Sequence, residues 1–100
     1  MAENSGDGEK YTLIFSPLAL EDLMFHKRVG NRATIKRIDR ILKELEITPF
    51  VGIGNPHELL HSYAGSWSRH LNKKDVMIYK VKESEKNVEI YSARFHYTDK

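Results

Sequence analysis

Histidine is the residue type of this chain with the clearest capacity to move protons, because an unperturbed imidazole titrates at about pH 6.5. Four histidines fall in the second half of the sequence: His57, His61, His70 and His96. His96 is followed directly by Tyr97 in the closing stretch SARFHYTDK. Side chains alternate along an extended segment, so Arg94 and His96 should share one side of a strand. This strand end is either a frayed tail or the rim of a site.

A second group of side chains could bind a phosphate or a base. The stretch SWSRHLNKKD contains one indole ring and three cations, on Trp67, Arg69, Lys73 and Lys74. Glu58 directly follows His57 and offers a carboxylate as a second candidate base. These side-chain types suit contacts with an RNA backbone and its bases.

The composition excludes several other kinds of chemistry. The chain has no cysteine, so disulfides, thiolate catalysis and cysteine-ligated zinc are ruled out. His57 and His61 have a spacing that can hold zinc on a helix, but Pro56 and the loop setting disfavour a helix there. We therefore expect no metal ion and no other cofactor.

The chain also lacks the patterns of a membrane protein. No apolar run reaches the roughly 20 residues that span a bilayer. The N-terminal stretch MAENSGDGEK is acidic and polar, unlike a secretory signal. We expect a cytoplasmic protein with no membrane contact. Residues 1–10 are predicted to be a disordered leader, and residues 11–100 a single domain.

Hydrophobic periodicity predicts the elements that position these groups. Residues 11–16 are expected to form a strand, and residues 17–29 and 32–47 two helices, the first capped by Ser16. Residues 48–56 are rich in proline and glycine and should form a loop. Three further strands are expected in a meander, over residues 66–71, 75–82 and 87–97. The fold class is thus α+β in two layers, with a helical hairpin covering one face of an antiparallel sheet.

Positive charge gathers in the predicted helical hairpin. Asp39 alone opposes a set of seven cations there, which we call the basic stripe: Lys27, Arg28, Arg32, Lys36, Arg37, Arg40 and Lys43. The stripe could attract an acidic partner or a phosphate backbone, or it could be a solvated helix face.

Four motifs occur in a fixed order: TPFVGIGNP, then WSR, then IYKV, then RFHY close to the C-terminus. Together they resemble the YoeB branch of the RelE-type toxins of bacterial toxin–antitoxin modules. The resemblance covers roughly residues 11–97. It implies a microbial-RNase fold and a ribosome-dependent mRNA endonuclease that uses the ribose 2′-hydroxyl as nucleophile. It also implies a cognate antitoxin, the ribosome and mRNA as partners, and it allows a homodimer.

The resemblance assigns roles to some of the candidate residues. His96 matches a histidine proposed as general acid, and Tyr97 matches a tyrosine that lines the same site. His57 stands where the family has the glutamate that acts as general base. Glu58 could take this role instead if the loop is shifted by one residue. His70 stands where the family has the second arginine of its WSRR motif. We expect the histidines to converge on one groove with His96 and Tyr97.

Two other positions depart from the family. Leu60 stands in place of a lysine, and Val76 in place of the arginine that stabilises the transition state. Lys74 or Lys80 could partly replace this charge, since alternation puts both on the side of Val76. Two hypotheses follow: an active nuclease with a rewired site, or a toxin-fold protein that binds antitoxin or ribosome without cleaving.

Overall fold

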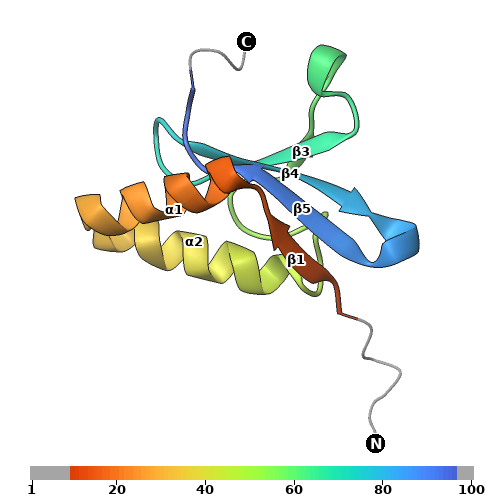
Figure 1. The fold of residues 1–100 in the computed structure, drawn as a ribbon, viewed down its shortest axis with the longest axis horizontal. Helices are drawn as coiled ribbons and strands as arrows, with labels where there is room; N and C mark the ends of the chain where they lie inside the picture. The colour runs from red at the N-terminus through yellow and green to blue at the C-terminus, as the bar shows by residue number, and fades with distance from the viewer. Residues whose placement is uncertain (1–9, 97–100) are drawn as a thin grey trace, which may run out of the picture.

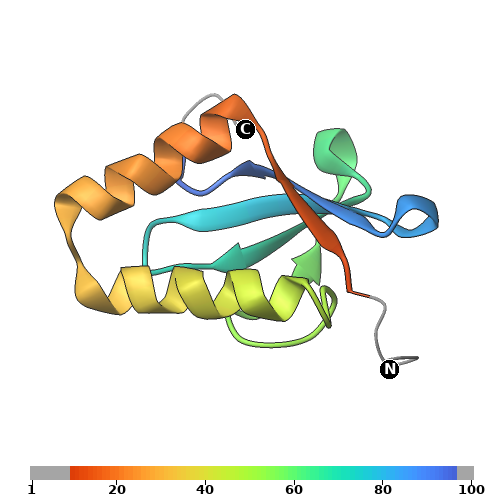
Figure 2. The same cartoon turned by 60° about the horizontal axis from the view of Figure 1, so that its bottom comes forward.

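The computed structural model describes residues 10–96, which form two layers (Figure 1). Helices α1 (Pro17–Val29) and α2 (Arg32–Leu45) form an antiparallel hairpin. Both lie across one face of a five-stranded sheet, as the turned view shows (Figure 2). The predicted α+β class, with helices on one side only, is confirmed. The predicted leader lies outside the described residues, except for Lys10.

Local sequence signals explain where the helices begin and end. The Ser16 hydroxyl accepts a hydrogen bond from the Ala19 N–H, and Pro17 occupies the first helical position. Gly30 ends α1 with a φ of 75°, a left-handed conformation that glycine adopts without steric cost. The Asn31 side chain then caps α2. The second helix ends at Leu45 rather than near residue 47.

The sheet contains β1 (Thr12–Phe15), β2 (His57–Glu58), β3 (Ser66–His70), β4 (Val76–Lys82) and β5 (Asn87–Ser92). Their order is β1-β5-β4-β3-β2. The predicted meander of β3, β4 and β5 is confirmed, because these strands pair antiparallel. The prediction of a purely antiparallel sheet was wrong: β1 pairs parallel to β5. In addition, β2 forms an unpredicted edge strand directly after the predicted loop.

The last strand is shorter than its sequence predicted. β5 ends at Ser92, and the bulge beside Ile78 and Tyr79 breaks the alternation of side chains. Beyond Ser92, carboxylates replace a neighbouring strand as acceptors of backbone N–H groups. Asp22 accepts from Ala93, and Asp75 accepts from Phe95. Residues 93–96 are called the C-terminal segment below.

One core joins the helices to the sheet. Its largest fully buried apolar side chains come from α2, from β4 and β5, and from the residue that follows β3: Ile41, Leu45, Met77, Tyr79, Val88, Ile90 and Leu71. Among residues 10–96, no α-helix covers the opposite face, here called the open face. In Figure 1, the segment around the 3-10 helix η2 (His61–Tyr63) and the C-terminal segment both rise from the sheet on the side away from α2.

Candidate functional site

Two histidines lie side by side on the open face. His57 of β2 pairs with Ser68 of β3, and residues directly opposite in a ladder point to the same face. His70 is two residues beyond Ser68 on the same strand, so it also points to the open face. The ring centroids of His57 and His70 are 6.2 Å apart, and both residues are exposed. We call them the histidine pair.

Hydrogen bonds fix the proton on the His57 ring. A carbonyl oxygen can only accept, so the contact of 3.1 Å between Nδ1 and the Asn55 oxygen requires an Nδ1–H donor. The second nitrogen, Nε2, is then an acceptor and lies 3.5 Å from the Ser68 hydroxyl oxygen. Nε2 is thus the ring nitrogen with a lone pair, and the Ser68 hydroxyl is its neighbour. This tautomer suits a general base.

The register distinguishes His57 from the alternative base. Glu58 pairs with Trp67, so both point to the helix-covered side of the sheet. The Trp67 ring packs against the core and lies 5.1 Å from the Phe50 ring. The structure therefore places His57, and neither Glu58 nor Trp67, beside His70.

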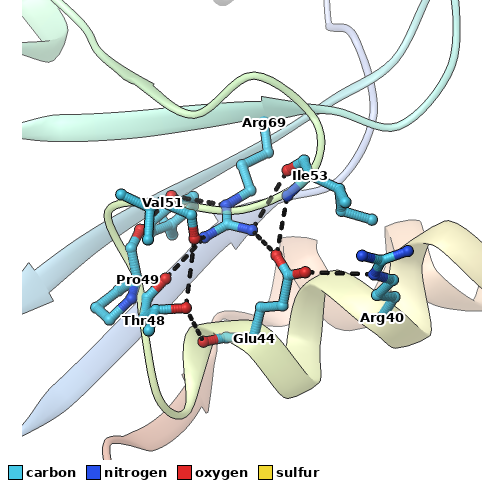
Figure 3. A network of polar contacts seen from close by, with 8 residues as sticks. Arg40, Glu44, Thr48, Pro49, Val51, Ile53 and Arg69 are labelled. Carbon is cyan, nitrogen blue, oxygen red and sulfur yellow. Dashed lines mark hydrogen bonds and ion pairs between the residues drawn. The ribbon is translucent and has the colours of Figure 1, made fainter.

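Arg69 has a structural position that the sequence did not predict (Figure 3). Its side chain is 0% exposed. The guanidinium donates to the carboxylate of Glu44 at 2.6 Å, to the Tyr79 hydroxyl at 3.1 Å, and to backbone carbonyls of the loop that follows α2. Those carbonyls belong to Thr48, Val51 and Ile53. The expectation that Arg69 binds phosphate is corrected, because its N–H donors face α2 and the loop that follows α2.

The acceptors of this network have shifted pKa values. Burial alone would raise the pKa of Glu44, but hydrogen bonds from Arg69 and the Ile53 N–H, with the Arg69 charge, lower it below the ordinary value for a glutamate. Burial raises the pKa of Tyr79, against the opposing influence of Arg69. The Tyr79 hydroxyl donates to the Pro49 carbonyl at 2.7 Å. Glu44 is thus a carboxylate, and Tyr79 a neutral phenol, at neutral pH.

Acid should weaken this network. A carboxyl whose pKa is lowered by folding adds stability above its unfolded pKa and loses that contribution as the pH falls through the folded value. Glu44→Gln should therefore be less stable than wild type at pH 7, and the difference should shrink towards about pH 3. Urea unfolding at both pH values measures this. Asp39→Asn, an exposed change on the same helix, is the control, and a pH-independent deficit of Glu44→Gln would contradict the prediction.

A second group of polar side chains surrounds the C-terminal segment. Lys74, Arg94, Phe95 and His96 line a shallow pocket of about 490 Å³. The Arg94 guanidinium lies 3.6 Å from the centre of the Phe25 ring. His96 donates from Nε2 to the Asp22 carboxylate at 3.0 Å. Sequence reasoning missed Asp22 and Arg94 as parts of this site, and Tyr97 lies outside the described residues.

The expected convergence of the histidines is realised only in part. His57 and His70 meet, whereas His96 bonds to Asp22 of α1, beyond β5. Strands are spaced about 4.8 Å apart, so β2 and β5 are separated by roughly 14 Å across the sheet. His61 starts η2 with a φ of 63° and is exposed. His57, His70 and His96 thus lie in a row along one end of the sheet, called the row below, and do not form one cluster.

Val76 occupies the middle of this row. It pairs with His70 on the open face, and its strand β4 lies between β3 and β5. Lys80 also points to the open face, opposite Ser66. Lys74 belongs to the pocket of the C-terminal segment, whereas Lys73 borders a different hollow beside Arg37. Lys74 is therefore the lysine that the structure places with His96. Leu60, the other departure from the family, is 70% exposed.

Over residues 10–96, no group of three or more His, Cys, Asp or Glu side chains is arranged to hold a metal ion. Within the same range, neither helix is long and apolar enough to cross a bilayer.

Comparison with known proteins identifies close relatives. The family described as "YoeB-like toxin of bacterial type II toxin-antitoxin system" matches residues 15–97. Toxin YoeB of Mycobacterium bovis is 36% identical over 83 residues, which cover 83% of this chain and 94% of that protein. Toxin YoeB of Escherichia coli K12 is 31% identical over 85 residues, covering 85% and 98%.

Solved structures agree with these matches. The YoeB/ParE toxin from Agrobacterium tumefaciens superposes with a TM-score of 0.77 at 29% identity, covering 86% of this chain and 99% of that one. A chain of the YoeB-YefM complex from Staphylococcus aureus gives a TM-score of 0.74 at 29% identity, covering 89% and 100%.

Proposed function

The chain belongs to the YoeB-like toxins of bacterial type II toxin–antitoxin systems, and on this premise we propose that it stops translation by cutting mRNA on the ribosome. The observation that carries the proposal is the histidine pair, whose rings are 6.2 Å apart on the uncovered face of the sheet. Because its proposed target is the ribosome, we propose that the protein acts in the cytoplasm.

The proposed reaction needs one proton removed and one returned. The ribose 2′-oxygen attacks the adjacent phosphorus as a base takes its proton. The bond from phosphorus to the 5′-oxygen breaks, and an acid protonates that oxygen. The products are a 2′,3′-cyclic phosphate and a 5′-hydroxyl. RNA alone is cut, because DNA lacks the 2′-hydroxyl.

The side chains of the row divide these tasks. His57 removes the 2′-proton, since its Nε2 is an acceptor at the open face. His96 returns a proton to the 5′-oxygen, as its match to the family histidine implies. His70 and Lys74 supply positive charge to the phosphorane on either side of Val76. In the phosphorane both reacting oxygens are bonded to one phosphorus, so cleavage requires this phosphate to lie over Val76, within reach of both imidazoles.

One observation favours a second function. Val76, half-buried in the middle of the row, has no charge with which to stabilise the phosphorane. A chain with this gap could still bind the ribosome and block translation without cutting. In that case translation would stop while the mRNA stayed intact. Reconstituted translation with mapped mRNA ends separates the two functions: new ends that depend on toxin support cleavage, and full-length mRNA on arrested ribosomes supports the second function.

Replacing Val76 by arginine should increase cleavage. A single well-placed charge contact on a transition state contributes about 10²–10³ in rate. Lys74 supplies part of this charge from the side, so we expect Val76→Arg to accelerate cleavage by about tenfold or more. Val76→Met is the matched control, since it adds length without charge. Equal rates for the two variants would show that charge at this position does not limit the reaction.

We also propose that a cognate antitoxin neutralises the toxin, since a Staphylococcus aureus relative is solved in a YoeB-YefM complex. All seven cations of the basic stripe are exposed. One of them, Lys27, lines an apolar groove of about 390 Å³ between the helices, where Leu20 and Met24 are 51% and 59% exposed. An acidic, partly apolar segment would suit this surface. A homodimer is proposed likewise, because a YoeB dimer from that organism is known.

A further inference from the structure

Helix α1 holds both peptide groups at the start of the C-terminal segment. The Ala93 N–H donates to Oδ2 of Asp22 at 2.9 Å, and the His26 ring donates from Nε2 to the Ala93 carbonyl at 2.7 Å. Asp22 and His26 are only 2% and 5% exposed. Buried polar groups with satisfied partners hold a backbone in one place. The chain therefore leaves β5 in a fixed direction.

The next two residues are held as well. Arg94 stacks its guanidinium on the Phe25 ring, which adds a cation–π contact to α1. The Phe95 N–H donates to Oδ1 of Asp75 at 2.9 Å, which ties the segment to the turn before β4. Each residue between the end of β5 and His96 thus has a contact that limits its movement.

His96 shares its acceptor with Ala93. Its Nε2–H donates at 3.0 Å to the same Oδ2 of Asp22 that accepts the Ala93 N–H. The Asp22 side chain is 3% exposed and that of His96 is 21% exposed, so solvent reaches the imidazole but not the carboxylate that holds it. A carboxylate only accepts, so Nε2 must carry a proton. Nδ1 is then the ring nitrogen that remains for a substrate.

We propose that Asp22 is a positioning residue for the reaction, which it serves by holding the Nε2–H of His96 and directing Nδ1 towards the departing 5′-oxygen. This inference rests on the proposed function. In the step itself, His96 reacts as the doubly protonated ring: its Nδ1 proton passes to the 5′-oxygen as the bond to phosphorus breaks, and the ring is left neutral. The Nε2–H of His96 stays hydrogen-bonded to Asp22 throughout. A carboxylate that orients a catalytic histidine in this manner is a recurrent arrangement.

Kinetics on ribosome-bound mRNA test this role. Asp22→Ala should lower kcat by about 10- to 100-fold with little change in KM, as expected for loss of a group that orients a histidine. In a His96→Ala background the same change should have no further effect, because Asp22 then has no histidine to orient. Asp22→Asn should be milder, since an amide oxygen can replace Oδ2 as acceptor. Glu21→Gln, the neighbouring carboxylate in the pocket beside His96, is the control and should leave kcat unchanged.

A measurement without RNA separates this inference from the proposed function. In protein with ¹⁵N-labelled histidine, the His96 Nε2–H should give a slowly exchanging NMR resonance that Asp22→Ala removes and Glu21→Gln retains. An unchanged resonance in Asp22→Ala, or an equal loss of kcat in both His96 backgrounds, would overturn the inference. If wild type cuts no mRNA, the proposed function fails, and the resonance alone then decides whether Asp22 positions His96. Should Asp22→Ala not fold, Asp22→Asn enters the same cycle and must show the same dependence on His96.

Discussion

Replacing His96 with alanine should lower the rate of mRNA cleavage by about 10²–10⁴-fold, the usual contribution of a positioned proton donor. The departing 5′-oxygen is a poor leaving group until it is protonated, and His96 is the residue assigned to protonate it. The rate is measured in single turnover on ribosomes stalled with the toxin's target codon. His61→Ala is the matched control, since it removes an exposed imidazole that lies outside the row.

A modified mRNA shows whether the lost function is proton donation. A linkage with sulfur in place of the bridging 5′-oxygen breaks without help from an acid, because a thiolate leaves readily. His96→Ala should cut this linkage at nearly the wild-type rate. His57→Ala should remain slow on it, because removal of the 2′-proton is still required. Slow cleavage of the sulfur linkage by His96→Ala would contradict its assignment as the acid.

Replacing Arg69 with methionine should destabilise the fold by about 3–5 kcal/mol, the range for removing one partner of a buried ion pair. The change leaves the carboxylate of Glu44 without its closest donor and removes the donors to Thr48 and Val51. Buried acceptors that lose their partners keep the cost of desolvation. Urea unfolding followed by tryptophan fluorescence measures the loss, because Trp67 lies next to Arg69 on β3.

A second arginine on the same carboxylate provides the control. Arg40 also donates to Glu44, at 3.3 Å, but its side chain is 68% exposed. Exposed pairs of this kind contribute about 0.2–1 kcal/mol. Arg40→Met should therefore cost little. Similar losses in the two variants would show that the burial of Arg69 does not determine its contribution.

Local signals in the sequence were sufficient for most of the fold. Ser16 and Pro17 marked the start of α1. The spacing of Ile35, Ile38, Leu42 and Leu45 marked an apolar seam on α2, of which Ile38 and Leu45 are buried. The parallel pairing of β1 with β5 depends on contacts between residues some 75 positions apart, such as Leu13 with Val88, which no local pattern encodes. β2 is only two residues long, too short for alternation to reveal it.

The candidate site was predictable only where the chemistry of single residues decides it. Histidines at 57 and 70 were singled out by type, and pairing of β2 with β3 brings them together. The choice between His57 and Glu58 required the register, because one residue along a strand changes the face. Arg69 shows the opposite case: an arginine in a strand predicts a phosphate contact, yet a carboxylate on α2 makes it a core residue.

The chemistry of the mRNA ends tests the central claim most directly. Purified toxin is added to ribosomes that translate a defined mRNA, and both fragments are recovered for analysis of their termini. Cleavage through the 2′-hydroxyl predicts a 2′,3′-cyclic phosphate on the upstream fragment and a 5′-hydroxyl on the downstream fragment, both lost with His57→Ala. Arrested ribosomes that carry intact mRNA would contradict the account.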